Sequence, residues 1–289
     1  MKFIYATDMH GNMLSFRVAL QTAKKMGIKN IIFGGDVSPR RMAIVINKEL
    51  VVILPTGQVM EYKEKFEKDS NCVIVHKSEK SVDIEKMFRD YFLKFSTHQA
   101  AWLSTVLLRE FMEFKKTYQC SISIMGANND PKKLVQIFDE AESNGIIQHL
   151  HNKAFVADDC MIAGYPFISP TPFQFEYWEK PEKEIYTDLK ELVKKSDISK
   201  TILVTHVPPK DTPLDVIWSG KHVGSSALRR FIENYKPLLN LSGHIHEAPK
   251  ISGKWLYRIG KTICINPSDS EDKLQLLIGD TERMNFKVI

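Results

Sequence analysis

Seven side chains that can bind a metal ion stand in five short groups along the sequence, and an apolar run precedes each group. The seven residues are Asp8, His10, Asp36, Asn128, His206, His244 and His246. Short apolar runs that end in turn residues are typical of buried strands. The carboxyl ends of such strands form the ligand-binding edge of an open α/β sheet. The series therefore predicts seven nitrogen or oxygen donors at one edge of a sheet, which indicates a metal site.

The first two groups also have simpler explanations when each is taken alone. Asp8 and His10 are two residues apart, so their side chains point the same way in an extended segment. A solvated turn aspartate beside an unrelated histidine explains this pair equally well. Asp36 follows Gly34 and Gly35, which allow a tight turn that brings its carboxylate close to the Asp8 site. An ordinary Gly-Gly-Asp turn is the alternative there.

The segments between these groups favour an α/β protein with parallel strands. Residues 14–26 have helical spacing and end at Gly27, a typical C-terminal stop, before the apolar run 30–33. This β-α-β order predicts a parallel strand pair. The segment 164–181 is rich in proline and aromatic residues, so it cannot be regular structure. It either lines a groove as a rigid loop or covers the core.

Taken in order, the five groups resemble the signature of the calcineurin-like metallophosphoesterase superfamily. That signature reads D-x-H, G-D, G-N-x-D, H and G-H-x-H, and its counterpart here spans residues 8–246. The run from Asp8 to Asn12, which reads Asp-Met-His-Gly-Asn, also resembles the prokaryotic phosphodiesterase-like branch. The resemblance implies a four-layer α/β/β/α sandwich of two mixed sheets.

The resemblance also implies a site with two divalent metal ions. Asp8, His10 and His246 would hold the first ion, Asn128, His206 and His244 would hold the second, and Asp36 would bridge both. The implied reaction is hydrolysis of a phosphate ester by attack of a metal-bridging hydroxide. A set of imidazole and carboxylate ligands without thiolate suits Mn, Fe or Zn, with Ni as a further candidate.

The third motif departs from the family pattern in a way that bears on the substrate. It reads Ala127-Asn128-Asn129-Asp130, so Asn129 stands where much of the family has a histidine. An amide can donate a hydrogen bond but cannot supply a proton to a leaving group. Phosphodiesters, which need less protonation than monoesters, are therefore the favoured substrates. The candidate catalytic residues are Asn129, Asp130 and, as another proton donor, His222.

The spacing of the motifs indicates one domain with an insertion. Asp36 and Asn128 are 128 − 36 = 92 residues apart, far more than one helix needs. We expect a single metallophosphoesterase domain over residues 1–289 with an α+β insertion at about 41–118. Because the insertion is tethered near the site at both ends, we expect it to form one wall of the substrate cleft.

The pattern inside the insertion changes from strands to helices. Strand-like runs cover residues 43–46, 49–54 and 58–62, which predicts a small hairpin or meander, and residues 72–75 are a candidate for a further strand. Helical spacing follows over residues 82–91 and 97–118, with Thr97 as the N-cap of the second helix.

Composition restricts the partners and the location. The 43% hydrophobic and 26% charged content is that of an ordinary globular protein, and no apolar run reaches the length of a membrane span. The four cysteines lie far apart, which favours reduced thiols in a cytoplasmic protein. The net charge of +5 is too small to indicate nucleic acid. A small phosphate ester is the expected partner, without membrane binding.

A non-catalytic role is the alternative to an enzyme. A metal-stabilised interaction or regulatory module could keep the ligands and lose turnover. The presence of all seven ligands argues against it, because a scaffold needs fewer.

Overall fold

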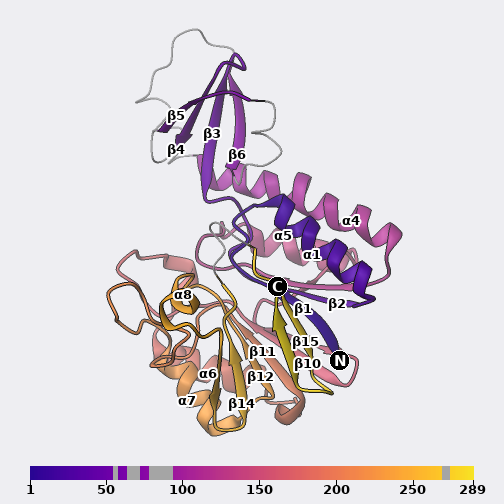
Figure 1. The fold of residues 1–289 in the computed structure, drawn as a ribbon, viewed down its shortest axis with the longest axis vertical. Helices are drawn as coiled ribbons and strands as arrows, with labels where there is room; N and C mark the ends of the chain where they lie inside the picture. The colour runs from indigo at the N-terminus through magenta and orange to yellow at the C-terminus, as the bar shows by residue number, and fades with distance from the viewer. Residues whose placement is uncertain (55–57, 64–71, 78–93, 269–273) are drawn as a thin grey trace.

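The computed structural model describes residues 1–54, 58–63, 72–77, 94–268 and 274–289, and Figure 1 shows their arrangement. In this part of the chain the strands form two six-stranded sheets and one four-stranded sheet. The first large sheet has the order β16-β15-β1-β2-β7-β8. Its strands are β1 (Lys2–Ala6), β2 (Asn30–Gly34), β7 (Ser121–Met125), β8 (Gln148–His149), β15 (Leu277–Asp280) and β16 (Asn285–Val288).

The second large sheet has the order β13-β14-β12-β11-β10-β9. Its strands are β9 (Lys153–Ala157), β10 (Cys160–Tyr165), β11 (Thr201–Thr205), β12 (Leu239–Leu241), β13 (Leu256–Ile259) and β14 (Thr262–Ile265). Both sheets are mixed. In the first, neighbours among β1, β2, β7 and β8 pair parallel, and β15 pairs antiparallel with β1 and β16. In the second, neighbours among β10, β11, β12 and β14 pair parallel, and β9 and β13 pair antiparallel at the edges. The parallel β1–β2 pair confirms the predicted β-α-β order.

The two large sheets pack face to face, and helices cover their outer faces. The α-helices are α1 (Met13–Met26), α4 (Leu108–Thr117), α5 (Leu134–Ser143), α6 (Glu182–Leu192), α7 (Ser226–Tyr235) and α8 (Ala248–Ser252). Helices α1, α4 and α5 pack on the first sheet, whereas α6 and α7 pack on the second (Figure 1). A core between the sheets joins Phe3 and Ile32 of the first to Ile202 and Leu241 of the second. These layers confirm the predicted α/β/β/α sandwich.

A small sheet follows β2 and stands apart from the two large ones (Figure 1). Its order is β5-β4-β3-β6, and its strands are β3 (Arg41–Ile46), β4 (Leu50–Leu54), β5 (Gln58–Glu61) and β6 (Cys72–Lys77). The predicted meander is therefore present. The helix predicted over residues 82–91 lies outside the described residues. The insertion boundaries at about 41–118 stay a prediction.

The chain returns to the main core through a long helical segment. Residues 94–102 are helical and continue through a π-helical turn, Leu103–Leu107, into α4. The prediction of Thr97 as N-cap is wrong, because the helix already includes residue 94. Phe95 packs against the core of the small sheet, so the helix is held by packing before it reaches Thr97.

None of the helices in the described ranges combines the length and the apolar character needed to cross a membrane.

Replacing Phe111 with alanine tests whether α4 belongs to the main core. The ring is fully buried and stacks on Phe33 with centroids 5.7 Å apart. We expect Phe111→Ala to lower the free energy of unfolding by about 3–5 kcal/mol, because it leaves a cavity in the core. Met112→Ala, one residue along and 46% exposed, should change it by less than about 0.5 kcal/mol. Equal effects in denaturant titrations would contradict this packing.

Candidate metal centre

The carboxyl ends of parallel strands from both large sheets bring the seven predicted ligands to one end of the sandwich. Asp8 and His10 follow β1, Asp36 follows β2, and Asn128 follows β7. The remaining three come from the second sheet, where His206 follows β11 and both His244 and His246 follow β12.

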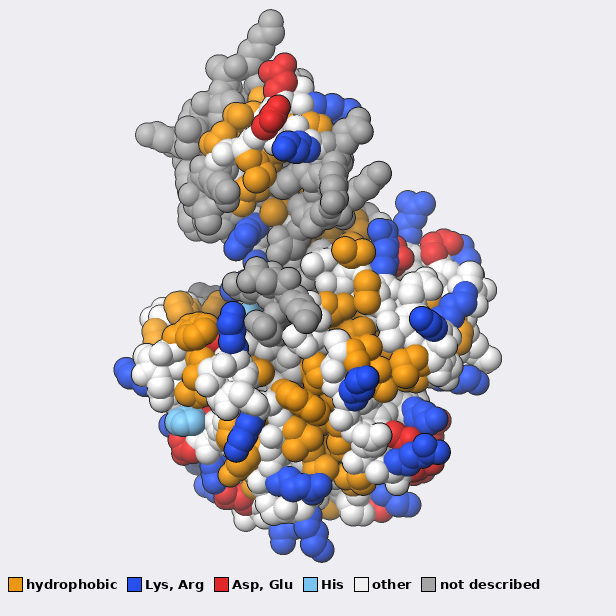
Figure 2. Space-filling model, viewed as in Figure 1, with side chains coloured by type: hydrophobic (Ala, Val, Ile, Leu, Met, Phe, Trp, Pro, Cys, Tyr) orange, Lys and Arg blue, Asp and Glu red, His pale blue; other side chains and the backbone are white. Residues whose placement is uncertain are grey.

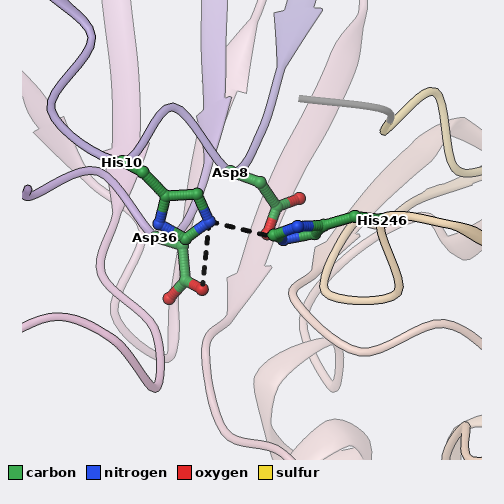
Figure 3. Close-up of side chains that lie close together, drawn as sticks. All are labelled: Asp8, His10, Asp36 and His246. Carbon is green, nitrogen blue, oxygen red and sulfur yellow. Dashed lines mark hydrogen bonds and ion pairs between the residues drawn. The ribbon is translucent and has the colours of Figure 1, made fainter. Parts of the chain in front are cut away.

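Four of these side chains form a compact cluster (Figure 3). Asp8, His10, Asp36 and His246 each offer one ligand atom, and these atoms all lie within 4.8 Å of one another. His246 Nε2 is 3.0 Å from Asp8 Oδ1 and 3.3 Å from His10 Nε2, which lies 4.0 Å from Asp36 Oδ2. Two carboxylates and two imidazoles at this spacing can hold a metal ion.

His206, His244 and Asn128 lie next to this cluster. His206 Nε2 is 3.5 Å from Asp36 Oδ2, and the rings of His206 and His244 have centroids 5.0 Å apart. The other ring nitrogen of His206 lies 3.1 Å from the Gly34 carbonyl oxygen, a contact that fixes the ring orientation. Asn128 and Asp36 line the same cavity. The structure thus gathers all seven predicted ligands in one region around Asp36.

Unpartnered buried atoms at this site fit a metal centre. Asn128 Oδ1 and His10 Nδ1 are buried without a hydrogen-bond partner among the described residues, and buried His206 Nε2 has only its ion-pair contacts with Asp36 and Asp8. Leaving such atoms unpaired costs about 1–3 kcal/mol each, so they need a ligand or water. Coordination by a cation would satisfy an amide oxygen and an imidazole nitrogen together.

The backbone is unusual at four of the predicted ligands. Asp8, His10, Asp36 and His244 have positive φ values of 56°, 44°, 50° and 66°. Non-glycine residues rarely adopt this region, and such residues cluster at functional sites. The extended geometry expected for Asp8 and His10 is wrong, because β1 ends at Ala6. Their side chains converge because both backbones turn left-handed beyond the strand.

Hydrogen bonds between neighbouring loops hold these turns. Asp8 N donates to Gly35 O at 3.0 Å, and His10 N donates to Asp36 O at 2.8 Å. His244 N donates to both Asp8 carboxylate oxygens at 3.2 and 3.1 Å. A Cβ atom on Gly243 would lie only 2.2 Å from Asp8 Oδ2, so only glycine permits this approach.

The charge states suit metal ligation. Burial raises the pKa of Asp36, but the charge and hydrogen bond of His206, the charge of His10 and the backbone hydrogen bond from Asn129 together outweigh burial, so the pKa is well below its usual range. Burial lowers the pKa of His206, yet Asp36 and Asp8 raise it to about 9 overall. Burial lowers the pKa of His10 and of His244 to about 3, which keeps both rings neutral. Neutral imidazoles and ionised carboxylates are the forms that bind metals, so His206 and His246, whose pKa values are raised, would release a proton when a cation binds.

Asn129 lies against the predicted bridging carboxylate. Its backbone N–H donates to Asp36 Oδ1 at 2.9 Å, and its side-chain Nδ2 donates to Asp36 Oδ2 at 2.5 Å. Asn129 also lines the cavity, so it can contact a substrate as well as orient Asp36.

Asp130 points into the protein and away from the cavity. It is buried and accepts four hydrogen bonds, from Val37 N, Ser38 N, Ser38 Oγ and Ala127 N. Burial and the charge of Asp36 raise its pKa to about 7, while the hydrogen bonds from Ser38 and Ala127 favour the carboxylate. Its catalytic role stays a prediction, and these contacts favour a positioning role for the loops that carry Asp36 and Asn128.

His222 is paired with a buried carboxylate outside the cluster. Its Nδ1 lies 2.7 Å from Asp215 Oδ1. Its neighbours Lys221 and Val223 line the cavity, and among the described lining residues His222 is absent. Its role as a proton donor stays a prediction.

The cluster of Asp8, His10, Asp36 and His246 opens on a cavity of about 1170 Å³. The proline-rich loop has both predicted roles: its residues 168–173 line this cavity, whereas Trp178 is buried in the core.

The wall of the cavity also has four basic residues that no sequence pattern predicted, and these are Arg40, Lys210, Lys221 and Lys250. No described residue of the small sheet lines the cavity, although Arg40 directly precedes β3. The insertion as a cleft wall stays a prediction.

Comparisons with known proteins identify the fold. No family model and no curated protein matches the chain. Among solved structures, one matches at a TM-score of 0.64 and 15% identity, covering 100% of this chain and 98% of its own. The protein TT1561 of Thermus thermophilus matches at a TM-score of 0.56 and 14% identity, covering 100% of this chain and 97% of its own. At these identities the likeness shows a shared multi-layer α/β fold.

An archaeal phosphodiesterase also matches along its length, with 13% identity and coverage of 100% of this chain and 99% of its own. Its TM-score is 0.42. Membership of the calcineurin-like superfamily stays a prediction.

Asp130→Asn tests the positioning role. An amide NH₂ would face donors that now meet a carboxylate oxygen, so we expect a loss of about 1–3 kcal/mol in the free energy of unfolding for each donor left unpaired. Metal content should fall as well. Asp197→Asn, at an exposed helix cap where asparagine serves equally well, should change neither quantity. If both variants behave alike in thermal unfolding and metal analysis, Asp130 does not hold the loops.

Proposed function

We propose that this protein is a metal-dependent phosphoesterase that prefers phosphodiesters to phosphomonoesters. The observation that supports it is the buried cluster of Asp8, His10, Asp36 and His246 beside a large cavity with a basic wall. Metal ligands of this kind next to cationic side chains suit an anionic ester better than a neutral substrate.

In this proposal two groups of three ligands each hold one cation, and Asp36 is a ligand of both. Asp8, His10 and His246 would hold one cation, and Asn128, His206 and His244 would hold a second, with Asp36 shared. Bound Mn, Fe, Zn or Ni ions would polarise the phosphoryl oxygens and lower the pKa of water.

The residues of the chain itself would orient the ester and set its reactivity. Asn129 donates to Asp36 and reaches the cavity, where its amide could also donate to a phosphoryl oxygen. It has no proton to give to a departing alkoxide. Lys210 and Lys221 of the wall would attract the phosphate. Esters whose leaving groups depart unprotonated are therefore the favoured substrates.

A small ester in the cytoplasm is the proposed substrate, in preference to nucleic acid. On the face shown in Figure 2, basic side chains are scattered among acidic ones and do not form a continuous stripe. A nucleic-acid groove usually has such a stripe.

Turnover of a bis-aryl phosphate with added Mn²⁺ tests the activity. Asp36→Asn should abolish hydrolysis. It should also weaken metal affinity by more than roughly 10–100-fold, which is the usual loss when a residue that supports a metal ligand is removed. Asn128→Ala is the matched control, because it removes a ligand of one ion only, and it should lose less metal. If Asp36→Asn keeps its metal and its full rate, the assignment is wrong. Metal-loaded protein without turnover on any phosphate ester would favour the non-catalytic alternative.

Asn129→His tests the missing proton donor. The wild-type rate should fall steeply as the leaving-group pKa rises, with aryl esters far ahead of alkyl esters. The histidine variant should flatten this dependence and gain up to roughly 10²–10⁴-fold on alkyl esters, the usual size of general acid catalysis. Metal content must be measured in parallel, with Asn129→Gln as a control that keeps the amide. A wild-type rate that is independent of the leaving group would contradict this role for Asn129.

A further inference from the structure

Two large aromatic side chains are exposed inside the cavity. Trp218 is 69% exposed and Phe173 is 77% exposed, and both line the cavity that contains Asp36 and His246. Large apolar side chains left open in a concave site mark places where ligands bind.

A hydrogen-bonded turn holds Trp218 in place. Gly220 N donates to Ile217 O at 2.8 Å, and Ile217 N donates to Lys221 O at 3.0 Å. An antiparallel bridge between Val216 and His222 closes the base of this turn. Trp218 therefore sits on a defined hairpin-like projection, which can present a flat ring to a ligand with little loss of entropy.

The helix that follows the ligand loop approaches the same ring. Lys250 of α8 lies four residues after His246, and its Nζ is 6.0 Å from the centre of the Trp218 ring. Lys250, Lys221 and Lys210 all line the cavity, and none has an ion-pair partner within the described ranges.

The wall also carries Glu182 and Glu247, and neither forms an ion pair with these lysines within the described ranges. Glu182 caps the start of α7, where it accepts from Ala227 N at 2.6 Å and Ser226 N at 3.1 Å. It also accepts from Ser225 Oγ at 2.8 Å. Because its carboxylate is engaged, the lysine ammonium groups remain available for anions beyond the one held at the metal cluster.

We propose that this wall is a nucleotide subsite, in which Trp218 stacks on a planar base and the lysines bind a second phosphate. The position of the first phosphate, at the Asp and His cluster, rests on the proposed function. The substrate class is thus a nucleotide with more than one phosphate. Phe173 gives a second apolar surface in the same cavity.

Equilibrium binding separates the base from the phosphates. The probes are the methylene analogue of ADP and methylenediphosphonate, which carries the same pair of phosphorus groups without the nucleoside. Calorimetry on the full chain with Mn²⁺ should show tighter binding of the nucleotide. Trp218→Leu should reduce the ratio of the two affinities roughly 5- to 100-fold, which is the usual strength of base–aromatic stacking. Trp218→Phe should keep most of it, and Lys250→Gln should weaken both probes.

Equal affinity of the two probes for the wild type would overturn the subsite, as would an unchanged preference in Trp218→Leu. The outcome is independent of turnover. A protein that hydrolyses bis-aryl phosphate but binds the two probes equally retains the proposed function and loses the subsite. A protein that prefers the nucleotide through Trp218 but hydrolyses no ester retains the subsite and loses the proposed function.

Discussion

Two carboxylates, Asp8 and Asp36, are buried together at the end of the sandwich, and the surrounding site compensates their charge. Burying an unpaired charge is far more costly than burying a paired one. His206 lies between them, 3.9 Å from Asp8 and 3.5 Å from Asp36, and backbone N–H groups of His244 and Asn129 donate to them. The neighbouring Asn128 Oδ1 and His10 Nδ1 still lack hydrogen-bond partners among the described residues. A bound cation would complete the compensation, which is why we interpret the cluster as a metal centre.

This constraint explains the strained loops and their supports. The two carboxylates converge only because their backbones adopt positive φ, a conformation that needs support from outside the loops. Asp130 supports the Asp36 loop from behind through Val37 and Ser38. Gln99, buried in the helix that returns from the small sheet, donates to Ser38 Oγ at 3.2 Å and to Asn129 O at 3.1 Å. The helix thus joins the loops of two strands, and the small sheet is connected to the site through it.

The region of the site was predicted from polar residues at strand ends, which follow simple rules of spacing, whereas the four-layer fold was predicted through the family resemblance that these motifs carry. Other features depend on contacts distant in sequence and left no local signal. Asp8 and His10 lie beyond β1, since hydrogen bonds to the next loop hold them. Trp218 and Lys250 are distant in sequence and approach each other only in the folded chain. The position of Lys250, four residues after His246, does not indicate this contact. The edge strand β16 (Asn285–Val288) was missed, because its alternation of polar and apolar residues extends over only four positions.

The central claim is that the two carboxylates share a metal site. Crystals grown with Mn²⁺, with data collected above the manganese absorption edge, test it most directly. The account predicts an anomalous peak in contact with the carboxylate of Asp36 and with an imidazole of the cluster. The absence of a peak there, with Asp8 and Asp36 still paired to histidines alone, would contradict it.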